Sequence, residues 1–134
     1  MQNIEFINKY INGTKNGNVI WDNCSIPSNK WDKAYITKKN NTIIAITFSE
    51  EKYKNGERVP DEYKMYILDS SMNELYKIDN TNLEEGETEY NRIYKKNDSL
   101  SLSRLYRLAD RSANKIDKLL AELSAGVDEE ELPF

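Results

Sequence analysis

The chain contains no histidine and one cysteine, Cys24, among its 134 residues. Without histidine, imidazole-based acid–base catalysis is excluded, and little remains with which to hold zinc. A single cysteine cannot form a disulfide within the chain. The sequence also lacks any run approaching the roughly 20 apolar residues of a membrane span, and its first residues carry no apolar signal-peptide core. We therefore expect a cytoplasmic protein with no membrane partner.

Catalytic motifs are missing as well. The sequence has no glycine-rich phosphate loop, no metal-ligand cluster and no pairing of serine or cysteine with histidine. The dense carboxylates between Glu84 and Glu89 lie in a glycine-containing stretch without a catalytic context, and a charged loop explains them better. We expect a binding protein rather than an enzyme, with no cofactor and no bound metal.

The net charge of −4 comes from 19 basic and 23 acidic side chains. Four of the acids occupy residues 128–131, and without them 19 acids balance 19 bases, so the rest of the chain is neutral. Its charge is uneven: residues 30–58 hold seven bases and four acids, residues 69–89 hold seven acids and one base, and residues 92–118 hold eight bases and three acids. Only local basic patches can therefore serve a polyanion such as DNA.

Short segments rich in Ile, Val, Thr, Tyr and Phe predict a mainly β fold with a long C-terminal helix. Strands are expected near residues 19–24, 33–38, 42–50, 63–69, 74–78 and 89–95. Within the expected strand 42–50, residues 42–48 are apolar or small on both faces, which predicts a central strand. Residues 1–18 fit either a short helix or a strand, and the polar residues 49–60 predict a long loop between two strands.

From Ser99 to Leu123 the periodicity becomes helical, with an apolar and a basic stripe at three- and four-residue spacing. The apolar stripe is Leu102, Leu105, Ala109, Ile116, Leu119, Leu120 and Leu123, and the basic stripe is Arg104, Arg107, Arg111, Lys115 and Lys118. The basic stripe either extends a DNA path, holds an acidic tail when no DNA is bound, or is simply solvated. Such a helix is long for one small domain, so part of it is expected to pair with a second copy.

Residues 30–66 interleave aromatic and basic side chains. A protein that binds single strands without sequence preference needs aromatic faces that stack on bases and cations that follow the phosphates. The alternative is that the rings fill a β core, and Phe48, in the most apolar strand, is assigned there. The candidate DNA-binding residues are Lys30, Trp31, Lys33, Tyr35, Lys38, Lys39, Lys52, Tyr53, Lys54, Arg58, Lys64, Tyr66, Arg104, Arg107 and Arg111.

The last seven residues place four carboxylates before an apolar end. Adjacent like charges favour a solvated, flexible segment, and Pro133 disfavours helix and strand. Phe134 suits a partner's pocket with an apolar hole and a basic rim. The candidate partner-binding residues are Asp128, Glu129, Glu130, Glu131, Leu132, Pro133 and Phe134. This pattern resembles the acidic tip of bacterial, phage and plasmid single-stranded DNA-binding proteins, which reads acid, acid, Ile or Leu, Pro, Phe.

The resemblance implies a sequence-tolerant protein that protects single-stranded DNA in replication, recombination or conjugative transfer. It also implies recruitment of replication and recombination enzymes through the tip, a homo-oligomer and an OB-fold barrel. In that family the helix lies between the third and fourth strands, whereas the helix expected here follows the last strand. A curved sheet followed by a helix, as in the PC4 and whirly types of single-strand binder, is therefore the alternative fold.

These expectations divide the chain into a β-rich DNA-binding domain over residues 1–98, an amphipathic helix over residues 99–124 and a flexible acidic tail over residues 125–134. The helix is expected to pack on the domain or on a second subunit. A competing hypothesis is a small phage or plasmid inhibitor or adaptor. In that case the acidic surface of residues 69–89 mimics DNA in a host protein's basic groove, and the helix is a protein interface.

Overall fold

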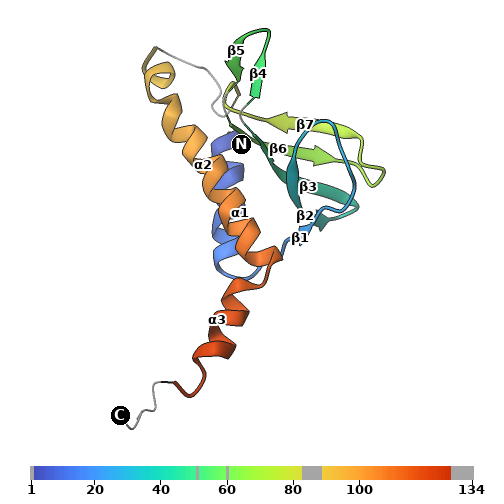
Figure 1. Cartoon of the computed structure of the whole chain (residues 1–134), viewed down its shortest axis with the longest axis vertical. Helices are drawn as coiled ribbons and strands as arrows, with labels where there is room; N and C mark the ends of the chain where they lie inside the picture. Colours follow the sequence, from blue (N-terminus) through green and yellow to red (C-terminus); the bar gives the residue numbers. More distant parts are fainter. Residues whose placement is uncertain (1, 51, 60, 83–88, 128–134) are drawn as a thin grey trace.

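The computed structural model describes residues 2–50, 52–59, 61–82 and 89–127. Five strands form one antiparallel sheet in the order β1-β2-β3-β6-β7 (Figure 1). Their bounds are β1 Asp22–Asn23, β2 Lys33–Lys39, β3 Thr42–Ser49, β6 Glu62–Leu68 and β7 Glu74–Ile78. In the described part of the chain the sheet is open, with β1 and β7 at its edges. The predicted combination of a β-sheet with C-terminal helices is confirmed, whereas the OB-fold barrel is not.

β3 is the central strand, as predicted, and its alternating side chains serve both faces of the sheet. Ile46 is in register with Tyr35 on β2 and Met65 on β6, and all three belong to the larger hydrophobic core. The neighbouring Ala45 is in register with Tyr66 on β6 and belongs to a second, smaller core on the opposite face. The continuous apolar run of this strand is therefore explained by burial on both sides.

Asparagine and glycine set the tight turns between neighbouring strands. Asn40 and Asn41 join β2 to β3 with φ of 52° and 64°, and two consecutive positive φ angles match the twist of a two-residue hairpin. The predicted loop 49–60 forms a second hairpin of strands β4 (Lys52–Lys54) and β5 (Glu57–Val59). Its turn is made by Asn55 and Gly56, with φ of 54° and 81°.

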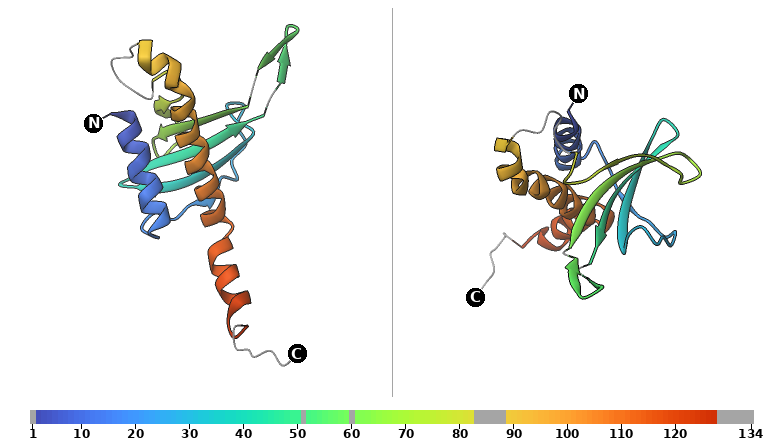
Figure 2. Two further views of the ribbon diagram at one scale, coloured as in Figure 1. Left: turned by 90° about the vertical axis from the view of Figure 1, so that its left-hand side faces the viewer. Right: turned by 90° about the horizontal axis from the view of Figure 1, so that it is seen from above.

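Two helices cover one face of the sheet (Figure 2). They are α1 (Asn3–Lys15) and α2 (Glu89–Ala113), which pack against each other, and α2 also contacts β1, β2, β3 and β6. The core between helices and sheet includes Ile7, Ile11, Trp21, Ile46, Met65, Leu102, Leu105 and Ala109. Trp21 lies between the layers, where its backbone N–H donates to Ser112 Oγ at 3.0 Å and its indole N–H to Thr14 Oγ1 at 2.9 Å.

The structure corrects two helix predictions. The strand expected at residues 89–95 is wrong, because α2 begins at Glu89. Tyr90, Ile93 and Tyr94 fit helical spacing as well as a β pattern, and local propensity cannot decide between them. The single helix expected over residues 99–123 is interrupted at Lys115, whose φ is 55°. The chain resumes as α3 (Ile116–Ser124), which projects away from the sheet (Figure 1).

None of the described helices is long and apolar enough to cross a membrane. Among the described residues, no group of three or more Cys, Asp and Glu side chains is placed to hold a metal ion.

Candidate nucleic-acid interface

Three half-buried aromatic rings meet at the end of the sheet where β3 ends and β6 begins. Phe48 on β3 is in register with Tyr63 on β6, and Tyr106 of α2 lies against both. Ring centroids are 5.2 Å apart for Phe48 and Tyr63, 5.4 Å for Tyr63 and Tyr106, and 5.8 Å for Phe48 and Tyr106. These are ordinary spacings for tilted aromatic pairs. We call this group, Phe48, Tyr63 and Tyr106, the aromatic cluster.

A buried tyrosine holds the aromatic cluster in place. The Tyr35 ring lies 5.2 Å from Tyr106, and its hydroxyl donates a hydrogen bond to the Asp110 carboxylate. Asn114 Nδ2 donates to the same carboxylate at 2.8 Å. Burial and the hydrogen bond to Asp110 raise the pKa of Tyr35 to about 12, and burial beside Tyr35 also raises the pKa of Tyr106. Both hydroxyls are therefore neutral at physiological pH, and the rings are fixed by α2.

The predicted base-stacking role of Tyr35 needs correction. Its side chain is fully buried, so no face of the ring is available to a base. Lys33, two residues earlier on β2, is exposed, and its Nζ lies 5.4 Å from the centre of the Tyr35 ring. Lys33 is also in register with Phe48. The lysine therefore places a positive charge beside the aromatic cluster.

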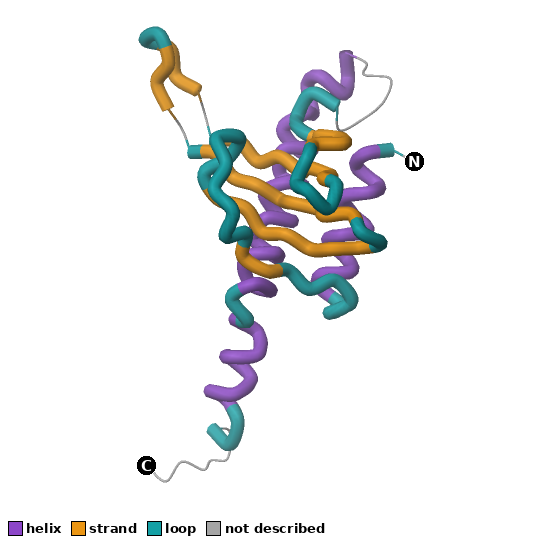
Figure 3. The backbone as a smooth tube through the Cα atoms, turned by 90° about the vertical axis from the view of Figure 1, so that its right-hand side faces the viewer, coloured by secondary structure: helices purple, strands orange, loops and turns teal. Residues whose placement is uncertain are grey.

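The β4–β5 hairpin projects from the same end of the sheet (Figure 3). Its strands follow directly from the end of β3, and Tyr53 is 74% exposed. The chain beside the hairpin is fixed by Asp32, whose carboxylate accepts a hydrogen bond from the Glu50 backbone N–H at 2.6 Å. The exposed Tyr53 ring and the half-buried aromatic cluster thus lie on neighbouring segments. The predicted residues Lys52, Lys54 and Arg58 belong to this hairpin, but their side chains lie outside the described residues.

On the opposite face of the sheet, a second ring pair lies under the loop that leads into β2. Trp31 is half-buried, and its ring lies 5.2 Å from that of Tyr66, which is 4% exposed. Tyr66, like Tyr35, is therefore a core residue and not an accessible stacking face. Lys30 Nζ lies 5.9 Å from the Tyr66 ring and 3.4 Å from Glu74 Oε1.

A hollow of about 370 Å³ adjoins Trp31 in this loop, lined also by Asn23, Ser28 and Lys33. The partly accessible Trp31 ring, the Lys33 side chain and polar side chains therefore line the same hollow. Of the neighbouring residues Lys30, Trp31 and Lys33, Lys33 lies at the end of the sheet that carries the aromatic cluster, because it is in register with Phe48. Lys30 instead pairs with Glu74, which is in register with Leu68 toward the other end, and the Trp31 ring packs on Tyr66 between the two ends.

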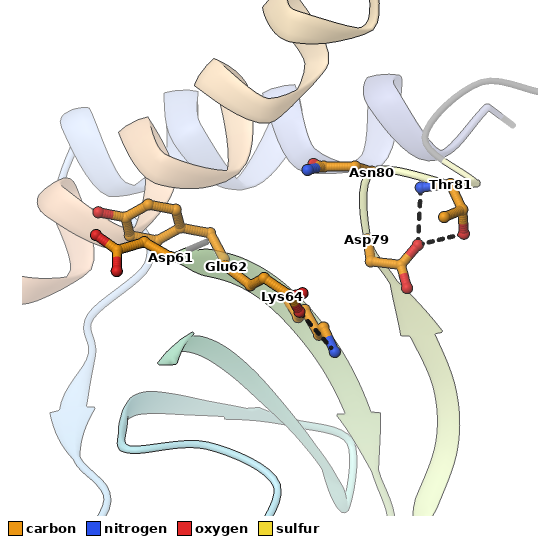
Figure 4. Close-up of a pocket in the computed structure, with 7 residues that line it drawn as sticks. Asp61, Glu62, Lys64, Asp79, Asn80 and Thr81 are labelled. Carbon is orange, nitrogen blue, oxygen red and sulfur yellow. Dashed lines mark hydrogen bonds and ion pairs between the residues drawn. The ribbon is translucent and has the colours of Figure 1, made fainter. Parts of the chain in front are cut away.

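An acidic hollow borders the aromatic cluster on the β6–β7 side (Figure 4). Its lining includes Tyr63, Glu62, Lys64 and Asp79. Lys64 Nζ pairs with Glu62 Oε2 at 3.1 Å; burial alone lowers the pKa of Lys64, but the hydrogen bond and charge of Glu62 raise it. Burial opposes ionisation of Asp79, but hydrogen bonds from Thr81 hold its pKa below the usual range. Phosphate is therefore disfavoured on this side, and Lys64 is already neutralised.

The remaining predicted cations lie elsewhere. Lys38 and Lys39 are exposed at the far end of β2, roughly 20 Å along the strand from Lys33. Arg104, Arg107 and Arg111 are exposed on α2, and Arg111 forms an ion pair with Asp117. The predicted DNA-binding residues thus form separate patches. The seven predicted partner-binding residues, 128–134, lie outside the described residues.

The residues that sequence reasoning missed are those of the aromatic cluster. The sequence pattern places Phe48 in the core and does not single out Tyr63 or Tyr106. Phe48 and Tyr63 lie near the ends of their strands, whereas Tyr106 lies within α2, between Arg104 and Arg107 in sequence. Only strand register and the crossing of α2 reveal that they meet at the rim of the core.

Comparison of this chain with protein-family models, with curated proteins and with solved structures finds no match.

Proposed function

We propose that this protein binds single-stranded DNA with little sequence preference, using the end of the sheet that carries the aromatic cluster and the β4–β5 hairpin. The observation that carries this proposal is the meeting of Phe48, Tyr63 and Tyr106 with a cation, Lys33, beside an exposed tyrosine, Tyr53. Half-buried rings are held firmly yet keep an edge or face toward solvent. That combination suits unpaired bases, which offer a π-face whatever their identity.

Each base that stacks on a ring contributes about 1–3 kcal/mol. Tyr53 has the most accessible ring, so it is the first candidate for stacking, and the aromatic cluster continues the path toward α2. Lys33 supplies positive charge at the same end of the sheet, and the acidic hollow beside Tyr63 directs the phosphates away from β7. Duplex DNA keeps its bases stacked inside the helix and cannot make these contacts.

The open sheet with helices packed on one face supports the PC4-like or whirly-like alternative over a closed OB-fold barrel. The proposed role also includes recruitment. Residues 128–134 are suited to bind replication or recombination enzymes, and this part of the proposal is supported by their resemblance to the acidic tip of single-stranded DNA-binding proteins.

Fluorescence anisotropy with a labelled, unstructured oligonucleotide and its duplex tests the proposal. We expect the single strand to bind more tightly than the duplex. We expect Tyr53→Ala to weaken single-strand binding by about 1–3 kcal/mol, which corresponds to about 5- to 150-fold. Tyr76→Ala is the matched control, because Tyr76 is also exposed but lies on the edge strand β7.

Deleting Leu132, Pro133 and Phe134 should leave the single-strand affinity unchanged in the same assay, because these residues are assigned to protein partners. Equal affinity for single strand and duplex would contradict the proposal. Failure to bind either form would favour the competing inhibitor or adaptor, whose target is a protein.

A further inference from the structure

The C-terminal ends of α1 and α2 lie side by side where α3 begins (Figure 2), and a hollow of about 430 Å³ lies against them. Four basic side chains line it, together with one carboxylate, that of Asp117, and two hydroxyls. None of the lining residues found in the described chain belongs to the aromatic cluster or to the β4–β5 hairpin. We call Lys15, Arg111, Lys115, Lys118, Thr14 and Ser112 the basic hollow.

Three of the four cations have no carboxylate partner in the part of the chain that the structure describes. Arg111 pairs with Asp117, whereas Lys15, Lys115 and Lys118 are exposed and form no ion pair with a described residue. Like charges held around one hollow repel each other. An anion that enters the hollow is therefore attracted by several ammonium groups at once and relieves their repulsion.

The negative ends of the two helices do not account for this charge. Two of the last carbonyls of α1, Asn12 O and Gly13 O, already accept the backbone N–H groups of Asn16 and Asn18 at 3.0 and 2.9 Å. Each helix C-terminus carries about half a negative charge, so two helices offset about one positive charge. The four cations less Asp117 give three net positive charges. About two of them therefore remain to attract an anion.

The break between α2 and α3 brings two of the lysines to α1. Lys115 has a left-handed conformation, with φ of 55°, which is unfavourable for a lysine. Its backbone N–H donates to Ser112 O at 3.1 Å, and α3 starts directly after it, so that Lys115 and Lys118 line the hollow together with Lys15. Unfavourable backbone conformations of this kind are concentrated at functional sites.

The buried Trp21 holds the two hydroxyls of the basic hollow. Its indole N–H donates to Thr14 Oγ1 at 2.9 Å, and its backbone N–H donates to Ser112 Oγ at 3.0 Å. The Thr14 O–H donates to Tyr10 O at 2.6 Å, whereas no acceptor of the Ser112 O–H is found among the described residues. Ser112 is therefore placed to donate to a ligand. A hydroxyl beside several ammonium groups is a donor set suited to phosphate oxygens.

We infer that the basic hollow binds a free polyphosphate anion, either inorganic pyrophosphate or the diphosphate of a nucleotide. The hollow is separate from the proposed DNA interface, and the inference does not rest on DNA binding. Its volume falls within the roughly 300–1,000 Å³ of small-molecule sites. Lys15, Lys115 and Lys118 would contact the phosphate oxygens, and Ile20, which is 67% exposed and lines the same hollow, offers an apolar surface to a nucleotide ring.

Isothermal titration calorimetry of the full chain with sodium pyrophosphate, in the absence of DNA, tests this inference. The wild type should bind, and Lys115→Asn combined with Lys118→Gln should weaken binding about tenfold or more, because two charged donors are lost. Asparagine tolerates the left-handed conformation of residue 115, so thermal unfolding should be unchanged. Arg104→Gln with Arg107→Gln is the matched control. It removes the same charge from exposed positions on α2 outside the hollow and should bind like the wild type.

Nuclear magnetic resonance locates the bound anion. Pyrophosphate should shift the indole N–H signal of Trp21, which is bonded to Thr14, and leave that of Trp31 in place, with Trp31→Phe assigning the two signals. ADP in place of pyrophosphate separates the two sources of the ligand. Tighter binding of ADP that Ile20→Ala removes would identify a nucleotide, and equal binding would identify the inorganic anion.

Three results would overturn the inference. The first is a wild type that binds neither pyrophosphate nor ADP, or an arginine control that loses as much affinity as the lysine variant. The second is binding that appears only after residues 128–134 are deleted, which would make the hollow the resting place of the acidic tail. The third is a lysine variant that loses affinity for an oligonucleotide alone, which would assign these cations to the DNA path. Tyr53→Ala should leave pyrophosphate binding unchanged, so failure of the DNA proposal is distinguishable.

Discussion

The two faces of the five-stranded sheet are built from similar residue types but closed in different ways. The face under α1 and α2 buries Ile46, Tyr35 and Met65 beneath two helices. The opposite face buries Ile43, Tyr66 and Leu68 beneath Trp31 and Met72, which belong to the loop before β2 and the turn before β7. The first face is covered by two helices, and the core beneath them is large. The second face is covered by a loop and a turn, and the core beneath them is small.

This difference locates the accessible rings. Both faces are closed near the middle of the sheet, and the half-buried rings described above lie where a cover ends. On the helix side the cover ends at Phe48, Tyr63 and Tyr106, and on the loop side it ends at Trp31. Binding at one end of the sheet, rather than across a flat face, follows from this closure. Three pairs of like residues, one on each face, test the comparison.

The largest effect is expected for the isoleucine pair on β3. Ile46→Ala should lower the free energy of unfolding by about 4 kcal/mol, because helices and sheet enclose the cavity and cannot collapse into it. Ile43→Ala should cost about 2 kcal/mol, because a loop and a turn can relax toward the vacated volume. Urea unfolding of both variants measures the two values. A larger loss at Ile43 would show that the loop-covered face is the main core.

The tyrosine pair should show a smaller effect, with a pH signature. Tyr35→Phe removes the hydrogen bond to the Asp110 carboxylate and should cost about 1–3 kcal/mol at neutral pH. The folded state raises the pKa of Tyr35 from 10.0 to about 12, so its contribution is fully present below pH 10 and is lost as the pH rises toward 12. The thermal unfolding temperature should therefore fall more steeply with rising pH in the wild type than in Tyr35→Phe over that interval.

Tyr66→Phe is the matched control on the other face. Tyr66 is also buried, but no hydrogen bond of its hydroxyl is found among the described residues. Its removal should change the free energy of unfolding at neutral pH by no more than about 0.5 kcal/mol. If Tyr66→Phe costs as much as Tyr35→Phe, the bond to Asp110 is not what distinguishes the two faces.

The sheet could be predicted from the sequence because its signals are local. The strands β2, β3, β6 and β7 follow runs of β-branched and aromatic residues, and the Asn40–Asn41 turn follows from residues that tolerate positive φ. The start of α2 could not be predicted, because the apolar residues within 89–95 fit both the helical and the β-strand periodicity. The break at Lys115 could not be predicted either, since the helical spacing of the apolar residues continues across it.

The candidate site was predicted only in part, because it depends on which face each strand residue takes. Within a strand, residues two apart point the same way, so Lys33 lies on the face of Tyr35 and Lys64 on the face of Tyr66. The register places Tyr35 opposite Ile46 and Tyr66 opposite Ala45, so the two pairs lie on different faces. Cross-strand register depends on tertiary packing and cannot be read from the spacing within a strand.

The smallest effect is expected for the pair Lys33 and Lys64. It decides which face of the sheet contacts the phosphate backbone of the bound strand. Lys33→Gln should reduce the slope of log affinity against log salt by about 0.7, the value for one neutralised phosphate on a single strand. Lys64→Gln should leave the slope unchanged, because Glu62 already neutralises that lysine in the folded protein. Anisotropy titrations at several salt concentrations measure both slopes.

Lys33→Arg keeps the charge and serves as the control, so its slope should match that of the wild type. The two glutamine variants each remove one positive charge, so a nonspecific effect of net charge would lower both slopes alike. A change confined to Lys64 would place the phosphates on the loop-covered face, beside Tyr66. A change confined to Lys33 means that the strand follows the rim of the helix-covered core, because there the cation is exposed beside rings that α2 holds in place.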